Sequence, residues 1–144
     1  VVSGSDVKLE RARALGAERG FNYRSTPEWG KETRGHDLVV DIGGAQSVPQ
    51  SLRAVRARGT ICLIGVVSGL SATLPLGPVV TRHVRLQGIS VGTPEQFESM
   101  LRAVDDHRLR PVVDRVFAFE ELRAALDYLA SGAHFGKICL AFPR

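Results

Sequence analysis

Three stretches of this 144-residue chain are apolar almost without interruption, and they limit the possible folds more than any other feature. They read DLVVDIGG at 37–44, TICLIG at 60–65 and VRLQGISVG at 84–92. Strands without polar alternation are typical of a parallel sheet that is buried on both faces. Segments with apolar residues at helical spacing lie between such strands, so strands and helices alternate. The sequence therefore predicts an α/β fold with a doubly wound parallel sheet.

Start and stop signals predict the remaining elements. Helices are expected at 6–17, closing on Gly16, at about 45–57, from Thr93 onward, and at 120–130. A short helix should have Pro27 in its first position and end near Gly35. Residues 66–78, which are rich in Gly, Ser and Pro, should form a loop. Further strands are expected at 19–24, 111–119 and 136–142, the last two in a different sheet because their connections are short.

Composition narrows the classes of function. Hydrophobic residues make up 44% of the chain and charged residues 24%, close to the averages for globular proteins. No apolar run reaches the ~18–20 residues that span a bilayer and no signal-peptide pattern opens the chain, so the cytoplasm is the expected compartment. The net charge of +4 comes from arginines scattered over the predicted helices, which argues against nucleic-acid binding. Cys62 and Cys139 lie far apart in apolar runs and are interpreted as small buried hydrophobic residues.

The carboxyl ends of the predicted strands carry mostly glycine and other small residues. A ligand of an open parallel sheet lies outside these ends. Glycine there lets the backbone approach a flat ligand and leaves peptide groups free to bond it, although glycines also end strands because turns need them. The strand ends are Ser3-Gly4-Ser5, Asn22-Tyr23-Arg24, Gly43-Gly44, Gly65 and Gly92.

A methyltransferase would use the same kind of sheet. It would need a glycine-rich loop after an acidic strand end and a second acid at the next strand end. Here VVDIGG continues at once into Ala45-Gln46-Ser47, and LIGVVSG ends without an acid. The sequence therefore favours another class of enzyme.

Six motifs, in their order and spacing, point to one family. They are SGSDVKLERARALGA, NYR, DLVVDIGG, SLRAVRARGTICLIG, VRLQGISVG and SGAHFGKICLAF, and they extend over the whole chain. This arrangement resembles the medium-chain dehydrogenase/reductase superfamily, which includes zinc-type alcohol dehydrogenases and quinone reductases. The resemblance implies a partial Rossmann-type sheet whose first strand and glycine-rich turn would precede Val1. Residues 1–110 would belong to the NAD(P)-binding domain, and residues 111–144 would return to a catalytic domain further upstream.

The missing first strand would be the central one of a 3-2-1-4-5-6 sheet. The strands expected at the start of the chain and at 37–42 would then lack their shared neighbour. We expect either that the two amino-terminal strands detach from the sheet or that another chain fills the gap.

The resemblance implies NADP(H) as the cofactor, in preference to NAD(H). Ser3 stands where a carboxylate would select NAD, and Ser3, Ser5, Lys8 and Tyr23 resemble the phosphate pocket of NADPH-dependent quinone reductases. Lys8 would supply a point charge and the three hydroxyls would donate to phosphate oxygens. The alternative is that Lys8 lies on a solvated helix face and that Ser5 or Asp6 caps the helix.

The resemblance also assigns residues to other parts of the cofactor. Gly43 and Gly44 would lie beside the adenosine and its ribose. The backbone around the nicotinamide would come from two further strand ends: Ile64, Gly65, Val66, Gly88, Ile89 and Ser90. Lys137 would reach the pyrophosphate, although a lone lysine is otherwise only a surface charge.

No residue of the chain resembles a chemical catalyst or a metal ligand. The four histidines are scattered, and none has a metal-binding partner at ligand spacing: His36, His83, His107 and His134. The zinc ligands and proton relay of the family would lie ahead of Val1. The sequence therefore does not separate a zinc enzyme from a zinc-free quinone reductase.

These observations predict the carboxy-terminal part of an NAD(P)H-dependent oxidoreductase. The intact enzyme would move hydride between the nicotinamide and an alcohol, an aldehyde or a quinone-type carbonyl, and this portion alone should be inactive. The expected partners are a small-molecule substrate and a second copy paired through the edge strand 84–92, with no nucleic acid or membrane. The alternative is a non-catalytic nucleotide-binding or dimerisation module. The substrate stays open, although residues 67–78 should line its pocket.

Overall fold

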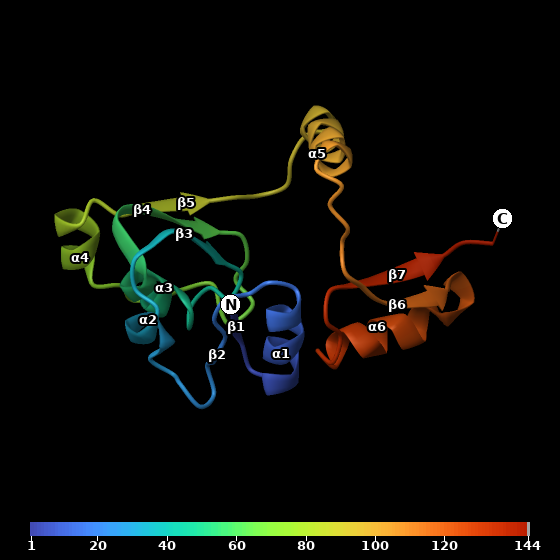
Figure 1. Ribbon diagram of the computed structural model, residues 1–144, viewed down its shortest axis with the longest axis horizontal. Helices are drawn as coiled ribbons and strands as arrows, with labels where there is room; N and C mark the ends of the chain where they lie inside the picture. The colour runs from blue at the N-terminus through green and yellow to red at the C-terminus, as the bar shows by residue number, and fades with distance from the viewer. Residues whose placement is uncertain (144) are drawn as a thin grey trace. The chain divides into compact units, whose positions relative to one another are not determined.

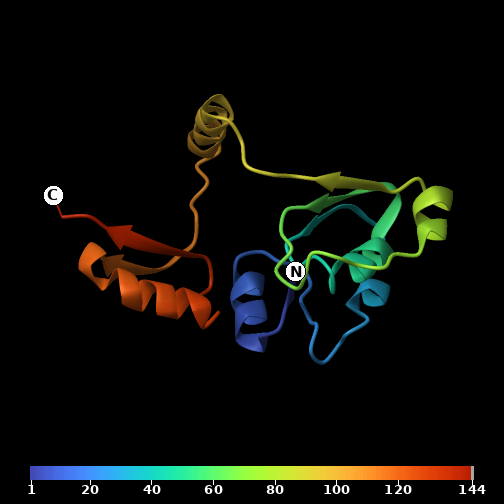
Figure 2. The ribbon, with the colours of Figure 1, turned by 180° about the vertical axis from the view of Figure 1, so that it is seen from behind.

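The computed structural model describes residues 1–143, and the chain divides into a compact unit of Val1–Val91 and a second unit that starts at Gly92. Helices alternate with strands in both units, and every strand pair in residues 1–143 is parallel (Figures 1 and 2). This confirms the predicted α/β class. The predicted division at residue 110 concerns the domains of a longer enzyme and stays a prediction.

The first unit contains two separate sheets. In one, β1 (Val2–Ser3) pairs with β2 (Phe21–Asn22). In the other, the strand order is β3 (His36–Asp41), β4 (Val55–Leu63) and β5 (Arg85–Gly88). No ladder joins β1 to β3 within the described residues, in agreement with the expected loss of contact between these strands.

The core of the first unit lies on one face of the three-stranded sheet. Helix α3 (Val48–Ala54) packs on β3 and β4 and buries Leu52. Around it lie Val55, Ile61 and Val84, with Val39, Leu63 and Val79 partly buried against them. Val79 comes from α4 (Leu76–Thr81), a helix that begins inside the segment predicted as a loop.

The opposite face of β3 is exposed, so the prediction of a strand buried on both faces is wrong in this structure. Leu38, Val40 and Ile42 are 55%, 59% and 63% exposed. The residues alternate along the strand and therefore share one face, and α3 covers the other face. The edge strand β5 is also exposed along its whole length.

Helix α1 (Asp6–Ala14) begins where the sequence predicts. The side chain of Ser5, its N-cap, accepts a hydrogen bond from the Lys8 N–H, and Gly16 follows the helix with φ +100°. Leu9 is buried. The helix is shorter than the predicted span of 6–17 because Leu15 already leaves helical geometry.

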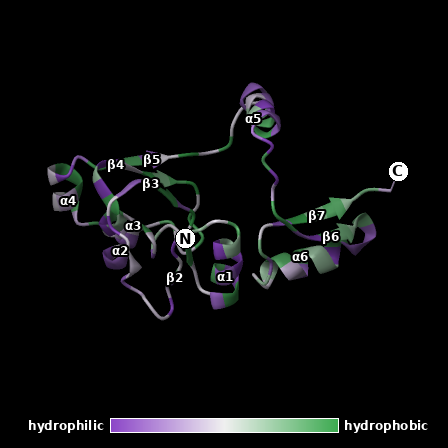
Figure 3. Cartoon of the chain, in the orientation of Figure 1, coloured by the Kyte–Doolittle hydropathy of each residue, from purple (hydrophilic) through white to green (hydrophobic). Residues whose placement is uncertain are grey.

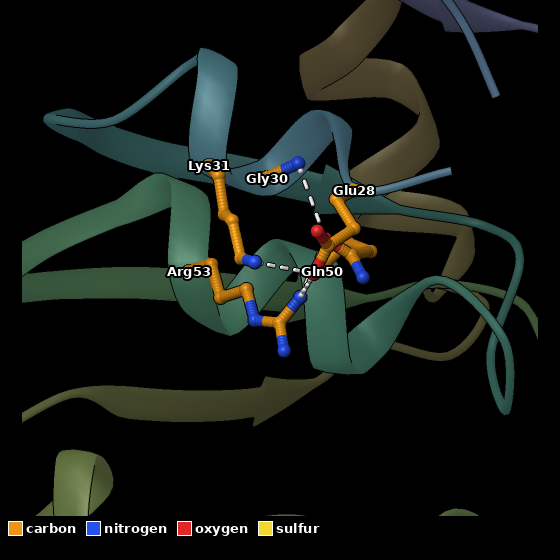
Figure 4. Close-up of polar contacts among 5 residues, drawn as sticks. All are labelled: Glu28, Gly30, Lys31, Gln50 and Arg53. Atoms are coloured by element: carbon orange, nitrogen blue, oxygen red, sulfur yellow. Dashed lines mark hydrogen bonds and ion pairs between the residues drawn. The ribbon is translucent and has the colours of Figure 1, made fainter. Parts of the chain in front are cut away.

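Helix α2 (Trp29–Glu32) packs against α3, but it starts two residues after the predicted Pro27. Trp29 is buried, and the N–H of Gly30 donates to Oε1 of Gln50 at 3.3 Å. Figure 4 shows Glu28 between two cations, with Lys31 Nζ at 2.6 Å and Arg53 Nη1 at 3.0 Å from its Oε1. The hydrogen bond from Lys31, together with the positive charges, holds the pKa of the Glu28 carboxyl below its usual range.

The second unit has its own small sheet, as predicted for the last two strands. Strand β6 (Val113–Ala118) pairs with β7 (Lys137–Ala141), and α6 (Leu122–Ala130) packs against both after the short helix η1 (Phe119–Glu121). Apolar residues are frequent in α6 and β7 (Figure 3). Phe117 and Ala125 are buried between these elements.

Helix α5 (Pro94–Asp106) begins at the predicted place, and Thr93 is its N-cap. The Gln96 N–H donates to the Thr93 side chain, and the Gln96 side chain accepts from the Thr93 N–H, which completes a capping box. Phe97, Met100 and Leu101 on this helix are exposed. None of the helices in residues 1–143 has the length and apolarity needed to cross a membrane.

Candidate functional site

The carboxyl ends of β1 and β2 bring three hydroxyl groups of the predicted site together. The Tyr23 N–H donates to the Ser3 carbonyl at 3.1 Å, which places the two strand ends side by side. The Ser3 hydroxyl accepts from the Ser5 N–H at 3.3 Å, and the Ser5 hydroxyl accepts from the Lys8 N–H at 3.4 Å. A hydroxyl that accepts a hydrogen bond still has its own hydrogen to donate. Ser3 and Ser5 therefore suit an anionic group.

The Ser5 hydroxyl also caps helix α1, which confirms the alternative interpretation of Ser5 as a capping residue. The two roles are compatible because capping uses the oxygen and phosphate binding would use the hydrogen. Asp6 follows in the first helical turn, where Asn22 Nδ2 donates to its Oδ1 at 2.8 Å. That hydrogen bond holds the carboxylate against the β2 end.

Gly4, Tyr23 and Arg24 form a close cluster that the sequence indicated only in part. A Cβ placed on Gly4 would lie 2.5 Å from the Tyr23 hydroxyl oxygen and 3.0 Å from Arg24 Nε. Any side chain at position 4 would thus displace both residues. Arg24 has no role in the sequence-based site, and the available signal was its position directly after Tyr23 at a strand end. It brings a guanidinium group to the same place as the hydroxyls.

The end of β3 is organised by a carboxylate inside the protein. Asp41 is 3% exposed. Its Oδ1 accepts from the N–H groups of Gly43 and Gly44 at 2.9 and 3.1 Å and from the Ser47 hydroxyl at 2.5 Å. Its Oδ2 accepts from the Ser51 hydroxyl at 2.6 Å. The N–H groups of the two glycines therefore point inward, so a ligand at this strand end would meet the glycine backbone at close range without these two donors.

The end of β4 lies directly against the end of β3. Gly44 has φ +84°, and a Cβ placed on it would lie 2.7 Å from Cα of Val66. A Cβ on Gly65 would lie 2.6 Å from the Ile42 carbonyl oxygen. Both positions therefore require glycine for packing, in addition to any contact with a ligand.

The end of β5 continues this row of strand ends. The Ile89 N–H donates to the Leu63 carbonyl at 2.9 Å, so the segment after Gly88 runs beside the segment after Leu63. Gly88, Ile89 and Ser90 are exposed, and a Cβ on Gly88 would meet nothing within 4 Å. These residues leave an open, accessible backbone beside Ile64–Val66.

Lys137 belongs to the second unit, where its N–H donates to the Val112 carbonyl at 2.8 Å and its side chain is exposed. Its predicted contact with a pyrophosphate stays a prediction. In residues 1–143, no group of three or more His, Cys, Asp or Glu residues is placed to hold a metal ion.

Two groups of strand ends in the first unit thus carry different chemical groups. Hydroxyl donors and a guanidinium lie at the ends of β1 and β2, and open backbone lies at the ends of β4 and β5 in the other sheet. β1, Gly4 and Ser5 carry no carboxylate, and the nearest acid along the chain, Asp6, accepts a hydrogen bond from Asn22 at the end of β2. The hydroxyls and the guanidinium can bind an anionic group, and the exposed backbone can bond a ligand.

Comparison with known proteins gives consistent matches. The family model described as zinc-binding dehydrogenase matches residues 15–140. A zinc-type alcohol dehydrogenase-like protein of Schizosaccharomyces pombe is 37% identical over 150 residues, which cover 97% of this chain and 43% of that protein. Quinone oxidoreductase-like protein 2 of Bos taurus is 27% identical over 153 residues, covering 96% of this chain and 44% of that protein. The chain thus spans less than half the length of these relatives.

Solved structures agree with the fold. A crystal structure of an NAD-dependent alcohol dehydrogenase is 34% identical with a TM-score of 0.83, and the match covers 96% of this chain and 42% of that one. Crotonyl-CoA carboxylase/reductase AntE in complex with NADP has a TM-score of 0.86 at 20% identity, over 96% of this chain and 42% of that one.

Proposed function

The chain belongs to the zinc-binding dehydrogenase family, and from this premise we propose that it provides most of the cofactor-binding part of an NADP(H)-dependent oxidoreductase. The resemblance to the medium-chain dehydrogenase/reductase superfamily is confirmed by the same match. The observation that carries the cofactor preference is the cluster of Ser3, Tyr23 and Arg24 at the ends of β1 and β2. A hydroxyl and a guanidinium there would bind the 2′-phosphate of NADP(H).

When bound, the dinucleotide supplies or accepts a hydride. The residues of this chain bind and orient it. Hydroxyl hydrogens of Ser3, Ser5 and Tyr23 would be donated to phosphate oxygens, with Lys8 and Arg24 supplying charge. The backbone of Ile64–Val66 and Gly88–Ser90 would hold the nicotinamide carboxamide and so select the ring face that meets the substrate. Lys137 would reach the pyrophosphate.

The reaction we propose converts an alcohol, an aldehyde or a quinone-type carbonyl. The alcohol dehydrogenase and quinone oxidoreductase names of the relatives support this class of substrate. Groups that polarise the carbonyl or move protons would come from the remaining length of such an enzyme, so residues 1–144 alone should not turn over. The same reasoning divides the chain into a cofactor-binding part at 1–110 and a returning segment at 111–144. A cytoplasmic location stays a prediction.

We also propose that two copies associate through β5. All four of its residues are exposed, and it is an edge strand of its sheet. Light scattering of the longest naturally occurring protein that contains this chain should give the mass of a dimer. A stable monomer that still binds cofactor would contradict this association.

The cofactor assignment is tested by titrating NADPH and NADH into the longest naturally occurring protein that contains this chain. The wild type should bind NADPH more tightly than NADH. Arg24→Ala should raise the Kd for NADPH by roughly tenfold or more, because it removes a charge-assisted hydrogen bond of about 1.5–3 kcal/mol, and should leave the Kd for NADH unchanged. Tyr23→Phe should act in the same direction to a smaller extent.

Arg13→Ala is the matched control, because it removes the same charge from the exposed surface of α1. Equal affinities of the wild type for NADPH and NADH would overturn the preference. Turnover of a panel of alcohols and carbonyls with NADPH would favour the enzyme, whereas cofactor binding without any turnover would favour the alternative of a non-catalytic binding module.

A further inference from the structure

The two loops that follow β3 and β4 are joined by one serine. The first strand-end loop comprises residues 42–47, and the second strand-end loop comprises residues 64–69. The hydroxyl of Ser68, in the second loop, donates to the Gly43 carbonyl at 2.7 Å. The Ser68 hydroxyl oxygen also accepts a hydrogen bond from the Gln46 N–H at 2.9 Å. One side chain therefore bridges two peptide groups that lie three residues apart in the other loop.

Backbone hydrogen bonds run beside this bridge. The Ser68 N–H donates to the Gly43 carbonyl at 2.7 Å, and the Ala45 N–H donates to the Gly69 carbonyl at 3.2 Å. At the base of the loops, the Ile64 N–H donates to the Asp41 carbonyl at 2.8 Å. The loops are thus connected from their base to their tips.

Asp41 holds the first strand-end loop from the inner side. Its carboxylate accepts from Gly43, Gly44 and Ser47, so these hydrogen bonds fix the shape of the first loop without any contribution from the second loop. Since Gly44 leaves no space between its backbone and Val66, the shape of one loop dictates the position of the other.

We propose that Ser68 is a positioning residue that transmits the geometry of the first strand-end loop to the second, and so fixes the peptide groups of Ile64–Val66 against the nicotinamide. The inference rests on the proposed function, because it assigns the first loop to the adenosine side of the cofactor and the second loop to the nicotinamide side. Ser68 does not itself touch the reacting atoms. Its effect is on orientation, to which hydride transfer is sensitive.

Ser68→Ala tests the connection without unfolding the protein. Gln46 is exposed, so water can replace the lost acceptor, and the Gly43 carbonyl keeps the Ser68 N–H. In the Ser68→Ala variant of the longest naturally occurring protein, amide hydrogen exchange should become faster in both loops together. The increase should be largest at the Gln46 N–H, and exchange in β4 should be unchanged. Ser71→Ala, at an exposed position of the same segment, is the matched control. Unchanged exchange in Ser68→Ala, or faster exchange in residues 64–69 alone, would overturn the proposed connection.

The effect on the cofactor is tested with two ligands, NADPH and adenosine 2′,5′-bisphosphate, which lacks the nicotinamide. Ser68→Ala should raise the Kd for NADPH roughly threefold to tenfold, the equivalent of about one hydrogen bond, and should shift the fluorescence of the bound reduced nicotinamide. The Kd for the bisphosphate should change less than the Kd for NADPH, because Asp41 still holds the Gly43 and Gly44 N–H groups of the first strand-end loop. Equal weakening of both ligands would indicate a general structural role and overturn the inference, as would unchanged binding and fluorescence of NADPH.

Failure of the proposed function gives a different result. A wild-type protein that binds neither ligand would contradict the cofactor site and, with it, the nicotinamide role of Ser68. The exchange measurement would still decide whether Ser68 connects the two loops.

Discussion

Replacing Asp41 with alanine should lower the free energy of unfolding by roughly 3–5 kcal/mol, because it leaves several inward-facing donors without an acceptor. Both the Gly44 N–H and the Ser51 hydroxyl are buried in their hydrogen bonds to this carboxylate. Water cannot easily replace an acceptor that is 3% exposed. Urea denaturation of the longest naturally occurring protein, monitored by circular dichroism, measures the change in the free energy of unfolding.

Two variants separate the carboxylate's role from a general effect of the strand. Asp37→Ala removes an exposed acid on the same strand, where it pairs with Arg56 at 2.5 Å, and should cost less than about 1 kcal/mol. Asp41→Asn keeps one acceptor oxygen, so its loss of unfolding free energy should lie between the losses of Asp37→Ala and Asp41→Ala. An Asp41→Ala protein as stable as Asp37→Ala would show that the network adds little to folding.

The second large effect is expected at Gly30, where α2 meets α3. A Cβ at this position would lie 2.2 Å from the Gln50 carbonyl oxygen and 2.9 Å from Gln50 Cα, so alanine would force the two helices apart. Gly30→Ala should therefore lower the free energy of unfolding by about 2–4 kcal/mol, in spite of the better helix propensity of alanine. Thermal and urea denaturation should agree on this loss.

Gly77→Ala is the matched control for Gly30→Ala. Gly77 also lies in a helix, α4, but a Cβ on it would meet nothing within 4 Å. Alanine there should leave stability unchanged or raise it by about 0.5–1 kcal/mol. If both substitutions stabilised the protein, the close packing of α2 on α3 would not exist in solution.

Local signals were sufficient for the order of helices and strands. The start of α5 after Thr93 and the strand in the apolar run at 37–42 both depend on neighbouring residues, so the sequence predicts them well. The predicted start of α2 at Pro27 is wrong by two residues, because the helix begins at Trp29, which is buried against α3. Such a contact depends on residues far along the chain.

Burial was predicted less well than secondary structure. The apolar residues of β3 indicate two covered faces, but within residues 1–143 the exposed face has no comparable covering layer. In the site, the sequence predicted that glycines and hydroxyls lie at the strand ends, and their contact with a cofactor stays a prediction. The inward direction of the Gly43 and Gly44 N–H groups was not predicted. The signal was Asp41 itself, a single acid inside an otherwise apolar strand.

The close approach of the two strand-end loops also restricts how the protein can diverge. A side chain at Gly44 would collide with the backbone of Val66, and one at Gly65 would collide with that of Ile42. A larger residue at either glycine is therefore acceptable only with a compensating change in the other loop. Segments that are some twenty residues apart in the sequence are inherited as one block, and natural variation should accumulate around that block, on the exposed faces of α1 and α5.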